Sequence, residues 1–95
     1  MNQALFVYET LLNPMIQKAV ISKCLHGVPD VLENYIELTK EGENTIIPQA
    51  KSTVEGQILY VSKEELKKID KYEGGKYKKI RVTLKSGISA WAYQK

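Results

Sequence analysis

Hydrophobic and polar residues alternate clearly near the C-terminal end of the chain. Between residues 78 and 84 the pattern gives a predicted strand one apolar and one polar face, with Ile80, Val82 and Leu84 opposite Lys79, Arg81 and Thr83. Ser86 and Gly87 favour a turn into a further strand over residues 88–93, so we expect a C-terminal β-hairpin. Residues 54–61 predict another strand, in which Gly56 indicates a bulge or the close approach of another group.

The N-terminal part of the sequence predicts a strand followed by a helix. The apolar residues 5–7 are typical of a buried first strand. Asn13 followed by Pro14 is the pattern of a helix start, with a capping side chain before a proline at the first helical position. Hydrophobic residues then recur at helical spacing until Gly27 and Pro29, which should stop the helix.

The middle of the chain gives weaker strand signals. Imperfect alternation predicts a strand over residues 31–39, and a turn is expected over residues 41–44. Residues 45–53 receive no firm assignment, because Pro48 favours at most a short edge segment.

A second helix is predicted by a capping box, in which Ser62 precedes Glu65 by three residues. Its inward-facing side chains should be those of Leu66 and Ile69. Glu73 is expected just after this helix, before a double glycine and a strand that opens at Tyr77. The acid would therefore lie at a helix-to-strand elbow, where a rigid frame can aim a functional group.

Composition narrows the class of protein. Ninety-five residues, 43% of them hydrophobic, should form one domain over residues 1–95. Strands interrupted by two helices indicate an α+β fold rather than alternating parallel units. The longest apolar stretch near the N-terminus is far too short for a membrane span and follows no basic leader, so we expect a soluble, cytoplasmic protein.

Cysteine and histidine are too scarce for several kinds of chemistry. A lone cysteine, Cys24, excludes an intrachain disulfide and agrees with a reducing compartment. Cys24 and His26 have no third orienting group in the pattern, so a structural role is expected for both. One histidine, one cysteine and two aspartates are too few for a convergent metal site, and we predict neither a metal nor another cofactor.

Two segments carry a family resemblance. Residues 56–77, GQILYVSKEELKKIDKYEGGKY, together with LFVYETLLNP at residues 5–14, resemble the gamma-glutamylcyclotransferase-like superfamily and particularly its gamma-glutamylamine cyclotransferase branch. In that family the acid of an "(L/I)D.YEG" motif faces a "YGTL" loop after the first strand. The resemblance implies a small mixed β-barrel with flanking helices.

The resemblance also implies a reaction. In this family the α-amine of a gamma-glutamyl amine or peptide attacks the side-chain carbonyl of the same molecule, which closes 5-oxoproline and expels the amine. Glu73 would be the catalytic acid and base. Backbone N–H groups of a substrate-binding loop would hold the glutamyl group, and Tyr77 would border the pocket. The loop residues are Tyr8, Glu9, Thr10 and Leu11. Burial against Tyr72, Tyr77 or Tyr93 would raise the pKa of Glu73.

Glu9 is the main departure from the family pattern, because the family has glycine at this position. Its bulk and charge keep an alternative open, in which the chain is a catalytically silent member of the fold that binds a small ligand or a partner. Tyr8 and Leu11 could equally be core-facing residues at the strand end, and Tyr77 could simply open a strand.

A basic stretch supports a further alternative. Residues 63–85 hold nine basic and four acidic residues, and single-stranded nucleic acid could bind such a barrel surface. The cations would be Lys78, Lys79, Arg81 and Lys85, with Tyr77 and Trp91 as stacking groups. A solvated lysine-rich face is the plainer interpretation of this stretch. The sequence indicates neither the leaving amine of a cyclotransferase reaction nor an oligomeric state.

Overall fold

The strands form one mixed sheet. The computed structural model describes residues 2–95, and within these residues five strands pair in the order β2-β3-β1-β5-β4. They are β1 (Gln3–Val7), β2 (Val28–Lys40), β3 (Glu43–Val61), β4 (Lys78–Thr83) and β5 (Ser89–Gln94). β1 runs parallel to β5, and the other pairs are antiparallel. The predicted C-terminal hairpin is confirmed as β4 and β5.

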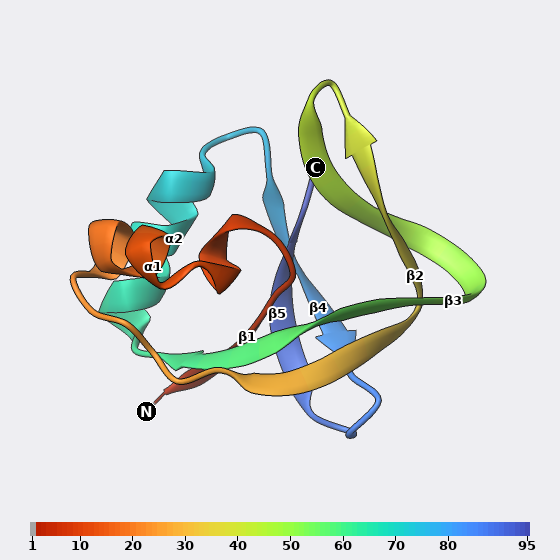
Figure 1. The fold of residues 1–95 in the computed structure, drawn as a ribbon, viewed down its shortest axis with the longest axis horizontal. Coiled ribbons are helices and arrows are strands. Elements are labelled where there is room, and N and C mark those ends of the chain that lie inside the picture. Colours follow the sequence, from red (N-terminus) through yellow and green to blue (C-terminus); the bar gives the residue numbers. More distant parts are fainter. Residues whose placement is uncertain (1) are drawn as a thin grey trace.

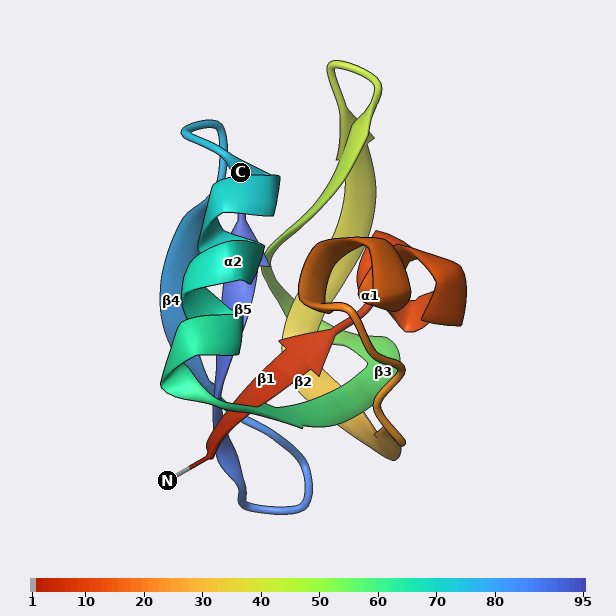
Figure 2. The same ribbon diagram turned by 90° about the vertical axis from the view of Figure 1, so that its left-hand side faces the viewer.

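The sheet curls into a half-barrel, as Figures 1 and 2 show. Its two ends approach one another just after β4, where the Lys85 N–H donates to the Val31 carbonyl of β2 at 2.8 Å. At the other rim, the Gln94 side chain of β5 donates to the Ile46 carbonyl of β3 at 3.1 Å. The expected α+β class is therefore confirmed, and the barrel is an open one.

Hydrophobic side chains fill both faces of the sheet. Phe6 and Tyr8 point into the half-barrel, whereas Leu5 and Val7 point toward the helices. Successive side chains of a strand face opposite sides, so a central strand that is buried on both sides must be apolar throughout. This explains the uninterrupted apolar run at residues 5–7.

The helices α1 (Pro14–Ile21) and α2 (Lys63–Glu73) lie together on one side of the sheet (Figure 1). A short 3₁₀ helix, η1 (Thr10–Leu12), which the sequence analysis did not predict, precedes α1. Asn13 caps α1 as expected, since its side chain accepts from the Met15 N–H at 2.8 Å. α1 ends earlier than predicted, because Ser22 adopts a left-handed conformation with φ of 64°.

The capping box of α2 is confirmed in both directions. The Ser62 N–H donates to the Glu65 carboxylate at 2.8 Å, and the Glu65 N–H donates to the Ser62 hydroxyl at 3.1 Å. Leu66 and Ile69 are buried against the sheet as predicted. The helix extends one residue further than expected, so Glu73 is its last residue and Gly74 is its C-cap.

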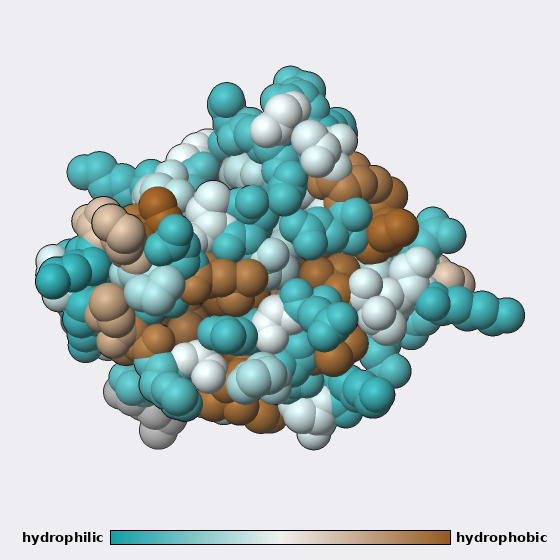
Figure 3. Space-filling view, viewed as in Figure 1, coloured by the Kyte–Doolittle hydropathy of each residue, from teal (hydrophilic) through white to brown (hydrophobic). Residues whose placement is uncertain are grey.

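β2 and β3 form a long hairpin whose tip is the predicted turn. Glu41 and Gly42 both have positive φ, of 54° and 77°, as a tight two-residue hairpin turn requires. In Figure 3, hydrophilic side chains cover this tip, and hydrophobic ones reach the surface lower on the hairpin. The exposed large hydrophobic residues there include the cross-strand partners Ile36 and Ile47.

The segment at residues 45–53 is longer than the short edge segment that Pro48 suggested, because all of these residues belong to β3. Pro48 pairs with Tyr35 of β2, in a part of β3 that has β2 as its partner and lies before the stretch paired with β1. A proline is tolerated at such an edge position. The imperfect alternation of β2 has its cause in a bulge at Asn34, where φ is 64°.

Gly56 is the point at which β3 crosses closely over β1. A Cβ atom at this position would lie 2.3 Å from the Val7 carbonyl oxygen and 2.8 Å from the Phe6 ring. The close approach expected for this glycine is therefore confirmed. At this position the end of β1, where the candidate substrate loop begins, packs closely against β3.

Candidate active site

A cavity of about 390 Å³ opens where several segments of the chain meet. The end of β1 and the following loop supply Tyr8, Glu9, Thr10 and Leu11, and the end of α2 supplies Glu73. Tyr77 also lines the cavity, and the tip of the β2–β3 hairpin closes another side. The structure thus brings together all the residues that the sequence analysis named for a cyclotransferase site.

Glu73 is partly buried at the end of α2. Burial raises the pKa of its carboxyl to about 7, with further contributions from the negative charges of Glu9 and Glu43. At neutral pH both protonation states are therefore populated. Such a carboxyl group can accept a proton and return it, which is what a general acid–base catalyst must do.

The loop after β1 lines the cavity. Glu9 precedes η1, whose turns are closed by hydrogen bonds from Leu12 and Asn13. Within residues 2–95, no hydrogen bond from the N–H groups of Glu9, Thr10 or Leu11 is found. Three backbone donors of a loop that lines the cavity therefore have no acceptor among the described residues.

The side chains of Tyr8 and Leu11 belong to the hydrophobic core. Both are buried, Tyr8 inside the half-barrel and Leu11 between helices and sheet. The Tyr8 hydroxyl donates to the Tyr93 carbonyl at 2.5 Å. The interpretation of Tyr8 and Leu11 as core-facing residues is therefore confirmed. The same loop also lines the cavity, and its role in substrate binding stays a prediction.

Glu9 reaches across the mouth of the cavity to the hairpin. Its carboxylate accepts from the Asn44 side chain at 3.2 Å, and the same Asn44 amide donates to Glu37 at 3.1 Å. The φ of Glu9 is −139°, which lies outside the positive-φ range that favours glycine. The glutamate adds a negative charge to the cavity.

Two tyrosine hydroxyl groups hold the walls of the cavity in place. Tyr77 donates to the Asn44 carbonyl at 2.6 Å, which ties the start of β4 to the hairpin. Tyr72 donates to the Thr10 hydroxyl at 3.1 Å, which ties α2 to the loop after β1. Both rings remain part of the cavity lining.

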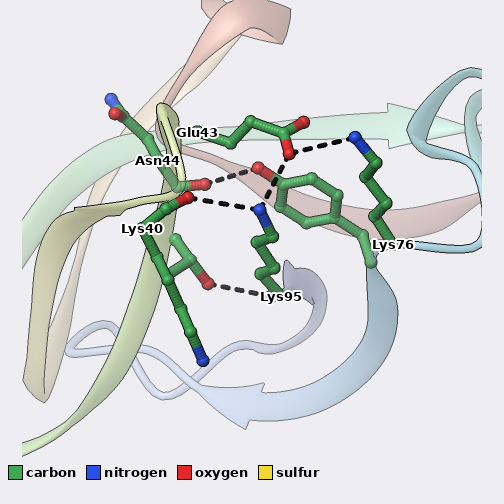
Figure 4. A network of polar contacts seen from close by, with 7 residues as sticks. Lys40, Glu43, Asn44, Lys76 and Lys95 are labelled. Carbon is green, nitrogen blue, oxygen red and sulfur yellow. Dashed lines mark hydrogen bonds and ion pairs between the residues drawn. The ribbon is translucent and has the colours of Figure 1, made fainter.

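A network around Glu43 fixes the hairpin tip, as Figure 4 shows. The Glu43 carboxylate points toward Lys95 and Lys76, at distances of 2.8 and 3.6 Å. The Lys95 ammonium group also donates to the Lys40 carbonyl at 3.2 Å. The hydrogen bond from Lys95, helped by the charge of Lys76, holds the pKa of Glu43 below its usual range, so this carboxylate stays ionised.

Sequence reasoning missed several residues that support the site. Gln17 is buried inside α1, where its side chain donates to the Leu11 carbonyl at 2.7 Å and accepts from the Leu25 N–H at 2.8 Å. A polar residue on a core-facing helix position is a signal that could have revealed it. Glu43 and Asn44 carried no such signal, because only the fold of the hairpin brings them to the cavity.

The remaining candidates lie away from the cavity. Cys24 and His26 are exposed, and neither lines it. Among residues 2–95, no group of three or more side chains that could hold a metal ion is found. Within the same residues, no helix is both long and apolar enough to cross a membrane.

The groups expected to bind nucleic acid do not form one stacking platform. Lys79 and Arg81 lie over the Trp91 ring, 5.0 and 4.6 Å from its centre, and so occupy its face. Lys79 also pairs with Asp70 at 3.0 Å. Tyr77, the other expected stacking group, lines the cavity instead.

Several solved structures share this fold. An Arabidopsis thaliana protein superposes with a TM-score of 0.87 at 24% identity, covering 99% of this chain and 62% of its own. A human protein described as uncharacterized has a TM-score of 0.83 at 19% identity, with 98% and 66% covered. A protein named gamma-glutamyl cyclotransferase has a TM-score of 0.77 at 18% identity, with 99% and 66% covered. The chain thus spans about two thirds of the length of these proteins.

At these identities the structural likeness shows the fold alone. A comparison with curated proteins found no match. A family model described as "Gamma-glutamyl cyclotransferase, AIG2-like" matches residues 5–95. Because this match extends over nearly the whole sequence, the chain belongs to the gamma-glutamyl cyclotransferase, AIG2-like family.

Proposed function

We propose that this protein is a cyclotransferase that releases 5-oxoproline and a free amine from a small gamma-glutamyl amide in the cytoplasm. One observation carries the proposal. A partly buried carboxyl group with a pKa of about 7, that of Glu73, shares a cavity with a loop whose N–H groups have no acceptor within the described residues. Membership of the family supports the same reaction.

In the proposed reaction, the substrate supplies both nucleophile and electrophile. Its α-amine attacks its own side-chain carbonyl, a carbon–nitrogen bond closes the five-membered ring, and the original amide bond breaks. Glu73 accepts a proton from the attacking ammonium group and returns it to the departing nitrogen, a role typically worth about 10² to 10⁴ in rate. The reaction needs no water and no nucleophile from the protein.

The cavity contributes orientation and charge stabilisation. The substrate must curl so that its amine meets its carbonyl, and a fixed orientation can supply about 7 kcal/mol or more of the barrier. The backbone N–H groups of Glu9, Thr10 and Leu11 would hold the glutamyl carboxylate or the developing oxyanion. Tyr72 and Tyr77 would shield the reacting groups from water.

The test is 5-oxoproline release from a panel of gamma-glutamyl amines and dipeptides. Glu73→Gln keeps the shape of the side chain but removes the base, so we expect turnover to fall by about 10² or more. The exposed Glu55→Gln serves as a matched control, and its turnover should equal that of the wild type. Unchanged turnover in Glu73→Gln would defeat the assignment.

Glu9 favours a second candidate, a silent member of the fold that binds a small ligand or a partner. Its carboxylate is held at the mouth of the cavity by Asn44 and would repel an anionic substrate group. Glu9→Gly separates the two functions. If the wild type is inert and this variant gains turnover or ligand affinity, the protein is a catalytically silent member of the fold. Turnover by the wild type would exclude that function.

A further inference from the structure

Tyr93 contacts both halves of the candidate site. It lies on β5, is almost fully buried, and lines the cavity. Its hydroxyl donates to a carboxylate oxygen of Asp70 on α2. Its carbonyl accepts from the hydroxyl of Tyr8, the first residue of the substrate loop, at 2.5 Å. One residue therefore links the helix that carries Glu73 to the loop that faces it.

The carboxylate of Asp70, which accepts this hydrogen bond, is fixed in position by further contacts. Its second carboxylate oxygen pairs with the Lys79 ammonium group at 3.0 Å. Lys79 is the cross-strand partner of Tyr93, so β4 and β5 together fix the acceptor. The Asp70 carbonyl also accepts from the N–H of Gly74, the C-cap residue of α2, at 3.0 Å. Asp70 thus belongs to the last turn of the helix, which ends at Glu73.

We infer that Tyr93, through its hydrogen bond to Asp70, is a positioning residue that sets how Glu73 faces the Tyr8–Leu11 loop. This inference rests on the proposed function of that site. Without the bond, the last turn of α2 would lose its polar tie to β5, and water would gain access to the Glu73 carboxyl. Misplacement of a catalytic group by about 1 Å can lower the rate by about 10²-fold. The loss of this one hydrogen bond can therefore change the rate of the reaction.

The titration of Glu73 reports its position without any need for turnover. The groups that act on it are the carboxylates of Glu9 and Glu43, from the loop and the hairpin, and Glu43 is itself paired with Lys95 and Lys76. Tyr8, Tyr77 and Tyr93 also line the cavity. Tyr93→Phe leaves all these charges in place, so a change in the titration would show a change in hydration or position.

The experiment compares wild type with Tyr93→Phe and with Tyr60→Phe, a control at an exposed tyrosine outside the cavity. Carboxyl ¹³C shifts of Glu73 are followed against pH by NMR in the ligand-free protein. We expect the wild-type midpoint near 7, a fall of about one pH unit in Tyr93→Phe as water reaches the carboxyl, and no change in Tyr60→Phe. Release of 5-oxoproline by Tyr93→Phe should fall about tenfold in kcat, with KM less affected.

The outcomes distinguish this inference from the proposed function. If wild type shows no turnover but the midpoint still falls in Tyr93→Phe, the function fails and the positioning role stands. If wild type is active and Tyr93→Phe matches it in both midpoint and kcat, the positioning role is overturned.

Should Tyr93→Phe fail to fold, two substitutions of Asp70 give the same test. Asp70→Asn keeps an oxygen that can accept from the Tyr93 hydroxyl, whereas Asp70→Ala does not. Asp70→Asn is expected to retain the wild-type midpoint and Asp70→Ala to lower it. Equal midpoints in the two variants would overturn the inference.

Discussion

At the scale of single residues, Glu73 shows how a site can be made at the expense of stability. Its carboxyl is partly buried beside the negative charges of Glu9 and Glu43, so the folded protein holds the proton more tightly than the unfolded chain does. Between an ordinary value of 4.5 and the folded value of about 7, the folded state binds more protons. The contribution of this carboxyl group to the free energy of unfolding is therefore fully present below pH 4.5 and is lost as the pH rises through 7.

This loss predicts the behaviour of Glu73→Gln in urea unfolding. At pH 8 the variant should be more stable than wild type by about 1 to 2 kcal/mol, a value reduced from the full shift because the side chain is partly solvated. At pH 5 the difference should shrink, since wild-type Glu73 is then protonated. Equal stability differences at the two pH values would show that Glu73 titrates normally.

At the scale of elements, local signals were sufficient for the helices and insufficient for the hairpin. Asn13 and the capping box of Ser62 and Glu65 predicted both helix starts, because a cap acts on its own first turn. The continuity of β3 through Pro48 could not be predicted in the same way. It depends on pairing with β2, and that pairing brings Asn44 to Tyr77, 33 residues away in sequence.

Gly56 tests the contact between β3 and β1. An alanine here would place its Cβ 2.3 Å from the Val7 carbonyl oxygen, a backbone atom that cannot move without shifting the strand. Gly56→Ala should therefore destabilise the protein by about 1 to 3 kcal/mol in urea unfolding. Gly75→Ala, where a Cβ would meet no atom within 4 Å, is the control. A loss no larger than in that control would show that the strands can separate freely.

The Glu43 network predicts how firmly the hairpin tip is held. Lys95→Met keeps much of the side-chain stem but removes the charge that pairs with Glu43 at 2.8 Å. Because an exposed ion pair contributes only modestly to stability, amide exchange of Thr45 and Ile46 should become no more than about two- to fivefold faster. Lys76→Met, which removes a longer and more exposed contact, should have a smaller effect. Equal exchange rates in wild type and Lys95→Met would contradict the role of this network.

At the scale of the whole molecule, the half-barrel makes the cavity by joining distant parts of the chain. The candidate acid and loop could be found from sequence because each lies in a short motif that resembles the family. The hairpin wall and the tie through Tyr93 could not, since their contacts arise only when the sheet curls and the helices pack on it. The site is therefore partly local in sequence and partly a product of the fold.

The pH dependence of 5-oxoproline release tests the central claim most directly. If Glu73 accepts the proton of the attacking ammonium group, kcat/KM should rise with pH to a half-maximal value near 7, the pKa of Glu73 in the cavity. It should decline again above about pH 8, where the α-amine of the substrate loses that proton. A profile that stays constant from pH 8 down to pH 5 would contradict the account, because no group with the raised pKa of Glu73 would then control the reaction.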